Sequence, residues 1–262
     1  MLTKFGFVYA FDLGSMWDNT QVLRRRIDSG EVEGPRIYST GEGLVPPGAL
    51  PSEGVLNAMG VMKFTAPEIA SASQAAAAAR RLLNDGVDAI KLFASSPRSV
   101  SLGEDTMRAA VNEAHKDGKP VFVHPNSSDD VLRALRAGAD IIGHTTPSSG
   151  PWSEEVLTAA VGRDAALTPT LTLWNYFSRH DRQSRQSDTV GAALRQLHDW
   201  RNAGGEVLFG TDLGAVDYDP AEEYRLMSES GMSFPEILAS LTRTPAARFG
   251  KDQGARSSRR RL

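Results

Sequence analysis

The chain contains no cysteine among its 262 residues, and this absence excludes several kinds of chemistry. No disulfide framework can form, no thiolate can act as a nucleophile, and no metal can be held by cysteine. Any metal site must therefore use histidine, carboxylate or a rarer ligand. The lack of cysteine also suits a reducing compartment, and we expect a cytoplasmic protein.

A strong excess of charge and a long apolar run are also missing. The formal net charge is -3 at pH 7, with acidic and basic residues interspersed, so the chain has no electrostatic footprint for nucleic acid or an anionic membrane. The apolar run within residues 1–15 is far too short to span a bilayer, and it lacks the basic start and cleavage site of a secretory signal. We therefore expect neither nucleic acid nor a membrane as a partner.

What the sequence does contain is a repeated local pattern, in which a helix ends at a glycine, a short apolar run follows, and a polar residue closes the run. Glycine provides the left-handed cap that ends a helix, and a continuous apolar run is typical of a parallel strand buried on both faces. The four segments are NDGVDAIKLF, KDGKPVFVHP, RAGADIIGHT and NAGGEVLFGTD. With further strands predicted within residues 5–13, 35–40 and 164–171, the alternation indicates a parallel α/β sheet, either doubly wound or closed as a barrel.

Helical patterns separate these strands. Two of them have sequence signals for an N-terminus. A capping box from Thr65 to Glu68 precedes residues 69–83, and Ser128 or Asp129 is the predicted cap of residues 130–137. The other predicted helices lie near residues 17–29, 103–117, 153–162, 189–203, 220–230 and 233–243.

Two segments lack such patterns. Residues 41–62 are rich in glycine and proline, and they are either a loop that shapes a substrate pocket or a mobile surface loop. Residues 251–262 are basic without an apolar face, which predicts a disordered tail. We expect residues 1–250 to form a single domain.

The polar residues that close the four apolar runs are Lys91, His124, His144 and Asp212. Sites in parallel α/β proteins are built at the carboxyl ends of strands, which is the position these residues occupy. Taken singly, each has an ordinary structural explanation: a hydrogen-bonded core histidine, a turn aspartate, or a lysine that reaches the surface or pairs with a carboxylate. Together, two imidazoles, a carboxylate and a lysine are typical of a metal hydrolase, because these ligands suit zinc and similar divalent ions.

Lys91 is the least expected of these residues, because it lies within an apolar run. If its strand belongs to a barrel, Ala89, Lys91 and Phe93 face one side, and Lys91 points to the barrel interior. Burial can lower the pKa of a lysine by about 3 to 5 units, and a neutral amine can capture carbon dioxide. The resulting carbamate would be an anionic oxygen ligand able to bridge two metals.

From about residue 5 to residue 250, the chain resembles the amidohydrolase superfamily, and within it the imidazolonepropionase-like group that includes prolidase-like, metal-dependent dipeptidases. The resemblance implies a (β/α)8 barrel of the TIM type with one or two divalent ions, zinc above all, at its carboxyl end. Lys91 resembles the strand-four lysine that is carboxylated in many members, and His124 and His144 resemble the ligands on strands five and six. Asp212 resembles the strand-eight aspartate, which binds metal and takes a proton from the attacking water. The motifs of the resemblance are GFVYAFDLGS, GPRIYSTG, DAIKLF, EAHKDGKPVFVHP, ADIIGHTTP, LTPTL, VLFGTD and MSESGMSFPEILASLTRTPAARFG.

The chain departs from this family at both ends. Members begin with a strand that closes in an HxH pair of metal ligands, and no HxH occurs in these 262 residues. We therefore expect a barrel without its first strand, and a site in which Lys91, His124 and His144 hold one ion beside Asp212. Unpaired strand edges favour association of copies, and we expect a homo-oligomer.

The function implied by the resemblance is metal-dependent hydrolysis of an amide or other C–N bond in a small molecule or dipeptide. Two alternatives stay open: a non-catalytic remnant that acts only as an assembly partner, and a doubly wound phosphate-binding protein, which would need a GxGxxG or Walker-type loop that the chain lacks. We place His115, His180 and His198 outside the site. Trp174 and Tyr176 either line a pocket or pack against neighbours.

Overall fold

The computed structural model describes residues 2–49, 66–96, 100–180, 187–212 and 219–250. The chain divides into two compact units, Met1–Gly143 and His144–Leu262, and each has its own helices and strands. No helix among the described residues is both long enough and apolar enough to cross a membrane.

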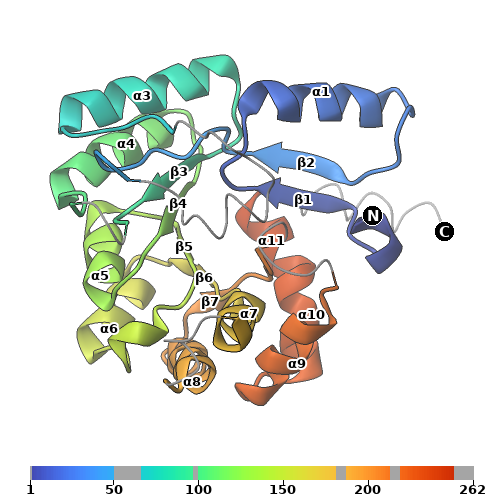
Figure 1. Cartoon of the computed structure of the whole chain (residues 1–262), viewed down its shortest axis with the longest axis vertical. Helices are drawn as coiled ribbons and strands as arrows, with labels where there is room; N and C mark the ends of the chain where they lie inside the picture. Colours follow the sequence, from blue (N-terminus) through green and yellow to red (C-terminus); the bar gives the residue numbers. More distant parts are fainter. Residues whose placement is uncertain (1, 50–65, 97–99, 181–186, 213–218, 251–262) are drawn as a thin grey trace. The chain divides into compact units, whose positions relative to one another are not determined.

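The first unit alternates strands and helices from its start to its end (Figure 1). Neighbouring strands pair in parallel: β1 with β2, β3 with β4, and β4 with β5. Its elements are η1 (Leu2–Phe5), β1 (Tyr9–Asp12), α1 (Trp17–Asp28), β2 (Arg36–Ser39), α3 (Ala72–Asp85), β3 (Ile90–Phe93), α4 (Glu104–Lys116), β4 (Val121–His124), α5 (Ser128–Ala137) and β5 (Ile141–Gly143).

The core of this unit explains why its strands read as continuous apolar runs. Strands of a parallel sheet are covered on both faces, so they need apolar side chains at consecutive positions. Six such side chains in β3, β4 and β5 are fully buried, namely Ile90, Leu92, Val121, Val123, Ile141 and Ile142.

Glycines end the helices that precede two of these strands. Gly86 follows α3 with a φ of 94°, and Gly138 follows α5 with a φ of 98°, so both adopt the left-handed conformation. A residue with a β-carbon is disfavoured there, which is why the chain uses glycine to turn from helix to strand. The helix, glycine and strand pattern predicted from the sequence is confirmed.

The predicted starts of α3 and α5 are wrong. Helix α3 begins at Ala72, capped by Ser71, because Glu68 is extended in a parallel bridge with Val45; Thr65 lies outside the described residues. Helix α5 begins at Ser128, and its cap is Ser127 rather than Ser128 or Asp129.

The second unit contains two parallel-paired strands, β6 and β7, with Leu167 opposite Val207. Its core includes the buried side chains of Leu167, Leu197, Trp200 and Met227. The elements are η2 (Pro147–Ser149), α6 (Glu154–Gly162), β6 (Ala166–Thr168), α7 (Leu171–His180), α8 (Thr189–Asn202), β7 (Glu206–Val207), α9 (Ala221–Glu229), α10 (Phe234–Leu241) and α11 (Arg243–Arg248).

All seven predicted strands are present among the described residues, whereas helices α7 and α11 were not predicted. The predicted tail, residues 251–262, and residues 50–62 of the glycine- and proline-rich connection lie outside the described part of the chain. Within the described part of that connection, Leu44 is fully buried and bridges Leu92 of β3.

Candidate active site

Lys91 is the second residue of β3 and is buried, with 3% of its surface exposed. Its backbone lies opposite Phe122 of β4, and Phe93 lies opposite His124. Because side chains alternate along a strand and paired residues of parallel strands share a face, Lys91, Phe93 and His124 lie on one face of β3 and β4. The predicted grouping of Lys91 with Phe93 is therefore confirmed.

Two glycines make room for the Lys91 and Phe93 side chains. A β-carbon on Gly143, at the end of β5, would lie 3.2 Å from the Lys91 Nζ atom, and one on Gly43 would lie 2.5 Å from the Phe93 ring. The Nζ atom also lies 5.4 Å from the centre of the Phe93 ring, within range of a cation–π interaction. The Lys91 amino group therefore has the Phe93 ring on one side and the Gly143 backbone, which has no side chain, on another.

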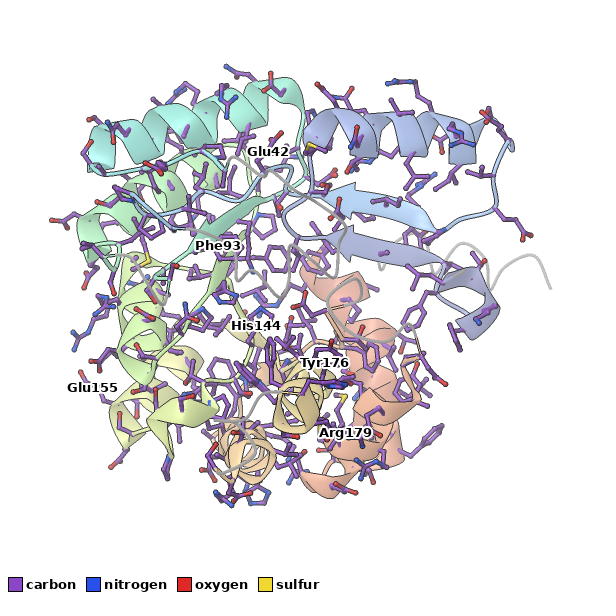
Figure 2. The ribbon with its side chains drawn as sticks, viewed as in Figure 1. Glu42, Phe93, His144, Glu155, Tyr176 and Arg179 are labelled. Carbon is purple, nitrogen blue, oxygen red and sulfur yellow. The ribbon has the colours of Figure 1, made fainter. Side chains whose placement is uncertain are left out.

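His124 is the last residue of β4, and the Phe93 ring packs against it with 5.0 Å between ring centres. Phe93, labelled in Figure 2, therefore contacts both Lys91 and His124. The sequence predicted that Phe93 shares a face with Lys91, but not that its ring packs against His124.

The hydrogen bonds of Asn126 set the orientation of the His124 ring. The Asn126 Nδ2 group donates to the Ser95 carbonyl at 2.9 Å, so the amide oxygen Oδ1 is the atom that faces His124 Nε2, at 3.4 Å. Since Oδ1 can only accept, the Nε2 atom is the donor in this contact, and a neutral imidazole in this orientation has its lone pair on Nδ1.

Asp130 holds this arrangement in place from the first turn of α5. It is 1% exposed, and its Oδ2 atom accepts from Ser95 Oγ at 2.6 Å and from the backbone N–H groups of Asn126 and Ser127 at 3.0 and 3.1 Å. Arg133 pairs with its other oxygen. Sequence reasoning missed Asp130, and the available signal was the capping pattern in which Ser127 is followed three residues later by Asp130.

His144 follows β5 and is also buried, with 6% exposed and a φ of 85° (Figure 2). Its backbone N–H donates to the Thr168 carbonyl at 2.8 Å, and its Nδ1 atom lies 2.6 Å from Thr170 Oγ1. The Thr170 hydroxyl donates its single hydrogen to the Pro169 carbonyl at 2.9 Å. Thr170 Oγ1 must therefore accept from His144 Nδ1–H, which places the imidazole lone pair on Nε2.

Asp212 lies five residues after the end of β7 and is exposed. Its φ of 59°, like the φ of 48° at Thr170, is in the left-handed region that residues with a β-carbon rarely adopt. Together with His144 and Asp164, these are the described non-glycine residues with positive φ. Backbone strain of this kind gathers at functional sites, and here it marks His144, its hydrogen-bond partner and Asp212.

Lys91 and His124 belong to the first unit, and His144 and Asp212 belong to the second. Among the described residues, no three histidine, cysteine, aspartate or glutamate side chains are grouped as a metal site would require. The donor atoms themselves suit a divalent ion, because each imidazole presents one ring nitrogen with a lone pair and Asp212 presents oxygen.

The other histidines lie on helices, which was expected for His115 and His198 but not for His180. His115, in the last turn of α4, pairs with Asp140 at 2.8 Å, and His198 on α8 bonds the Ser230 carbonyl. His180 stacks on Tyr176 near the end of α7. Trp174 and Tyr176 also lie on α7, where Trp174 packs against Phe177. The Trp174 indole N–H is buried with no hydrogen-bond partner among the described residues.

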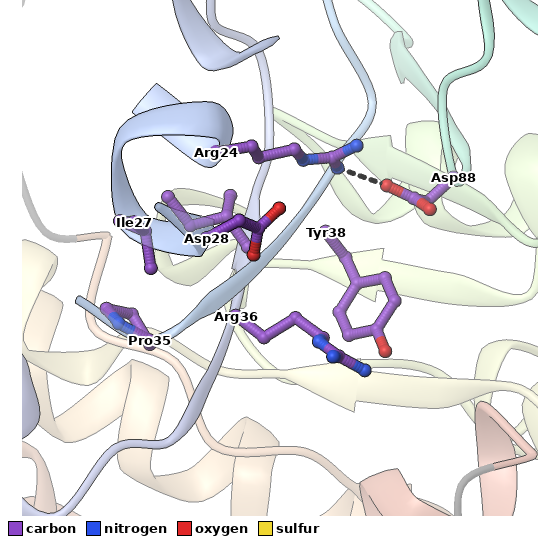
Figure 3. Close-up of a pocket in the computed structure, with 8 residues that line it drawn as sticks. Arg24, Ile27, Asp28, Pro35, Arg36, Tyr38 and Asp88 are labelled. Atoms are coloured by element: carbon purple, nitrogen blue, oxygen red, sulfur yellow. Dashed lines mark hydrogen bonds and ion pairs between the residues drawn. The ribbon is translucent and has the colours of Figure 1, made fainter. Parts of the chain in front are cut away.

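A separate pocket of about 300 Å³ lies between α1 and β2 (Figure 3). The Arg24–Asp88 ion pair crosses it, and Arg36 and Tyr38 also line it. Pro35 and three of the four β2 residues line it, so the pocket follows most of the length of that strand. None of the four candidate residues is among the described residues that line this pocket.

Glu223 is a second buried acid that sequence reasoning missed. It lies on α9, is 0% exposed, and accepts hydrogen bonds from the first residues of α7. Burial raises the pKa of Glu223 to about 7, against the opposing effect of its donors. The available signal was its helical spacing from Leu226 and Met227, which places Glu223 on the buried face of α9.

Comparison with known proteins gives consistent results. About half of the chain, 148 residues, is 29% identical to an uncharacterised protein of Mycobacterium tuberculosis (strain H37Rv), of which it covers 39%. A Xaa-Pro dipeptidase crystallised with methionine in its active site is structurally similar over 95% of the chain, with a TM-score of 0.80 and 21% identity. The A. niger ochratoxinase is similar over 93%, with a TM-score of 0.74 and 20% identity.

The chain is shorter than these relatives, covering 65% of the dipeptidase structure and 61% of the ochratoxinase. The model of the amidohydrolase family matches residues 37–255, which is most of the chain. The predicted fold class, an α/β barrel of the TIM type, is confirmed by this match and by the structural similarity, whereas the absence of its first strand stays a prediction. The chain belongs to the amidohydrolase family.

Proposed function

We propose that the chain is a metal-dependent hydrolase that cleaves an amide or other C–N bond of a small molecule or dipeptide. The observation that supports this most is the state of the two histidines. Neighbouring groups accept from His124 Nε2 and from His144 Nδ1, so in each neutral ring the other nitrogen would be the metal-binding atom. The similar Xaa-Pro dipeptidase supports dipeptides as the substrate class.

In this proposal Lys91, His124 and His144 hold the ion and Asp212 is an additional ligand that is not essential for binding. Zinc is the ion that these donors suit best. Because no three His, Cys, Asp or Glu side chains among the described residues are grouped as a site, a three-ligand centre has to draw on Lys91. Lysine becomes a ligand when its neutral amine adds carbon dioxide and releases a proton, which yields a carbamate with two oxygen donors.

Asp212 performs the proton transfers. When bound, a divalent ion lowers the pKa of a coordinated water towards ~7 and polarises the carbonyl of the substrate. The Asp212 carboxylate accepts the proton that the attacking water loses and then delivers it to the leaving nitrogen. Asp212 is exposed to solvent, which is compatible with this role.

Metal content tests the proposed site. The protein is purified without chelators and with bicarbonate, and metal is measured by elemental analysis in the wild type, Lys91→Ala and Lys116→Ala. We expect about one divalent ion per chain in the wild type and in Lys116→Ala, which loses only an exposed ion pair with Glu113, and a loss of the ion in Lys91→Ala. An unchanged metal content in Lys91→Ala would contradict the role of the lysine.

Turnover tests the role of Asp212. In a wild type that hydrolyses a dipeptide from an Xaa-Pro panel, Asp212→Asn should lower kcat at least ~100-fold, because a general base contributes that much or more. Metal content should stay near the wild-type value, with Asp219→Asn as a matched control. Wild-type turnover in Asp212→Asn would exclude the proton-transfer role.

A second candidate is a non-catalytic member that acts only in assembly, and the absence of any HxH pair favours it. This candidate predicts no bound metal, no hydrolysis and association of copies, which light scattering would detect. A metal-free, inactive and associated wild type would support this candidate over the hydrolase.

A further inference from the structure

Glu223 makes three hydrogen bonds to the start of helix α7. Its Oε1 atom accepts from the backbone N–H of Leu171 at 2.9 Å, and its Oε2 atom accepts from the N–H and the hydroxyl of Thr172 at 2.7 and 2.8 Å. All three residues are buried. The first N–H groups of a helix have no partner within the helix, so Glu223 acts as the N-terminal cap of α7 from a different helix.

This cap changes what Thr170 is able to do. A threonine directly before a helix usually caps it with its own hydroxyl. Here the Thr170 hydroxyl donates to the Pro169 carbonyl at 2.9 Å, and its oxygen receives the His144 Nδ1–H at 2.6 Å. Because Glu223 satisfies the N–H groups of Leu171 and Thr172, the Thr170 oxygen is available to His144.

Two features make the arrangement depend on Glu223. Thr170 has a φ of 48°, a conformation that a β-branched residue adopts only when its surroundings impose it. The residue that follows Thr170 is the first one held by Glu223. Without the carboxylate, two buried N–H groups would lose their acceptor, and the Thr170 hydroxyl would become the nearest replacement.

We propose that Glu223 is a positioning residue for His144: by capping α7, it holds Thr170 as the acceptor of His144 Nδ1–H and so keeps the lone pair on Nε2. The consequence for metal binding rests on the proposed function, in which His144 is a ligand. The proton position on His144 does not rest on it.

The test compares Glu223→Gln with Glu222→Gln. A glutamine at position 223 has one acceptor oxygen and would turn an NH2 group towards one of the two N–H donors. Glu222 is the matched control, since it lies on the same helix and bonds Asn175 and Arg225 instead of the start of α7. The ring-proton position of His144 is read from long-range 1H–15N NMR spectra, and Zn2+ affinity is measured by calorimetry with bicarbonate present.

We expect the proton on His144 Nδ1 in the wild type and in Glu222→Gln, and a mixture of both ring forms in Glu223→Gln. Zn2+ affinity should fall about 10- to 100-fold in Glu223→Gln only, which is the usual effect of losing a partner that orients a metal ligand. Thr170→Val, which keeps the shape and removes the acceptor, should behave like Glu223→Gln, and Thr170→Ser should restore the wild-type behaviour. The Thr170 pair tests the acceptor of His144 Nδ1–H separately, and Glu223→Ala replaces Glu223→Gln if the latter does not fold.

A folded Glu223→Gln with the His144 proton unchanged on Nδ1 would overturn the proposal, as would a wild-type proton on Nε2. A wild type that binds no Zn2+ would instead contradict the proposed function. The NMR measurement on the metal-free chain would still decide the role of Glu223.

Discussion

At the scale of single residues, the question is how a lysine tolerates burial inside an apolar strand. Lys91 is 3% exposed, and the atoms around its ammonium include the Phe93 ring and the backbone at Gly143. Position 143 has to lack a side chain for Nζ to lie where it does. In the sequence, Gly143 is only the residue before His144. The pairing of the strands shows that it leaves space for the Lys91 Nζ atom.

Gly143→Ala should therefore move the lysine. The added β-carbon would lie 3.2 Å from Nζ, and the ammonium, at the end of a flexible side chain, would shift by a few tenths of an ångström. We expect the fold to persist and Zn2+ affinity to fall about tenfold, as when the support of a metal ligand is disturbed. Calorimetric titration measures this, with Gly162→Ala as the control, because a β-carbon at Gly162 meets no atom within 4 Å. Equal affinity in both variants would show that the space at position 143 is unimportant.

At the scale of secondary structure elements, the first turns of two helices also order the residues that contact candidate ligands. The first turn of α5 contains the buried Asp130, whose acceptors hold Ser95, Asn126 and Ser127 behind His124. The first turn of α7 is held by Glu223 of α9 behind His144. In each case a buried carboxylate satisfies backbone N–H groups at a helix start and thereby orders the partner of a candidate ligand.

Asp130→Asn should destabilise the chain more than a change of its exposed neighbour. The amide loses the charge that strengthens these hydrogen bonds and the ion pair with Arg133, for an expected cost of roughly 3 kcal/mol in the free energy of unfolding. Asp129→Asn, also in the first turn of α5 but exposed, should cost well under 1 kcal/mol. Urea unfolding compares the two, and similar midpoints would contradict the structural role of Asp130.

At the scale of the whole molecule, stability depends on pH through Glu223. Its pKa is raised from 4.5 to about 7 in the folded chain because the carboxyl group is buried. Between these values the unfolded chain has lost the proton that the folded chain keeps, so the contribution to stability is full below pH 4.5 and is lost as pH rises through 7. Surface acids act in the opposite direction, since hydrogen bonds and ion pairs lower the pKa of Glu222 and Glu236.

The free energy of unfolding should therefore respond differently to pH in the wild type and Glu223→Gln. Each pKa unit corresponds to about 1.4 kcal/mol, so between pH 4.5 and 7 the wild type should lose roughly 3 kcal/mol relative to the variant, as pH rises. The test is the slope of the unfolding free energy against pH. Hydrogen bonds lost in the variant would change the free energy by the same amount at every pH and leave the slope unchanged. Denaturant unfolding at several pH values provides the measurement, and parallel curves would contradict it.

The length of the chain relative to similar proteins also matters for the proposed activity. It spans 39% of its curated relative and 65% of the similar dipeptidase structure. The single domain expected over residues 1–250 stays a prediction, as do the homo-oligomer and the cytoplasmic location. Metal content of the wild type is the measurement that separates a working hydrolase from a non-catalytic member.

The sequence by itself determined the features that depend on neighbouring residues. The left-handed glycines that end α3 and α5, the buried apolar strands and the polar residues near their carboxyl ends are all local patterns, because backbone conformation and side-chain alternation act over a few positions. These patterns were sufficient to single out Lys91, His124, His144 and Asp212 as candidates.

Only the tertiary structure decided what lies around those candidates. Helix α7 was missed because its cap, Glu223, lies 51 residues beyond Thr172 in the chain. In the same way, Asp130 bonds Ser95 from 35 residues away, and Gly143 meets Lys91 only because β3, β4 and β5 pair in parallel. Hydrogen bonds and packing between distant segments leave no periodic trace in the sequence, so the state of each histidine follows from the fold.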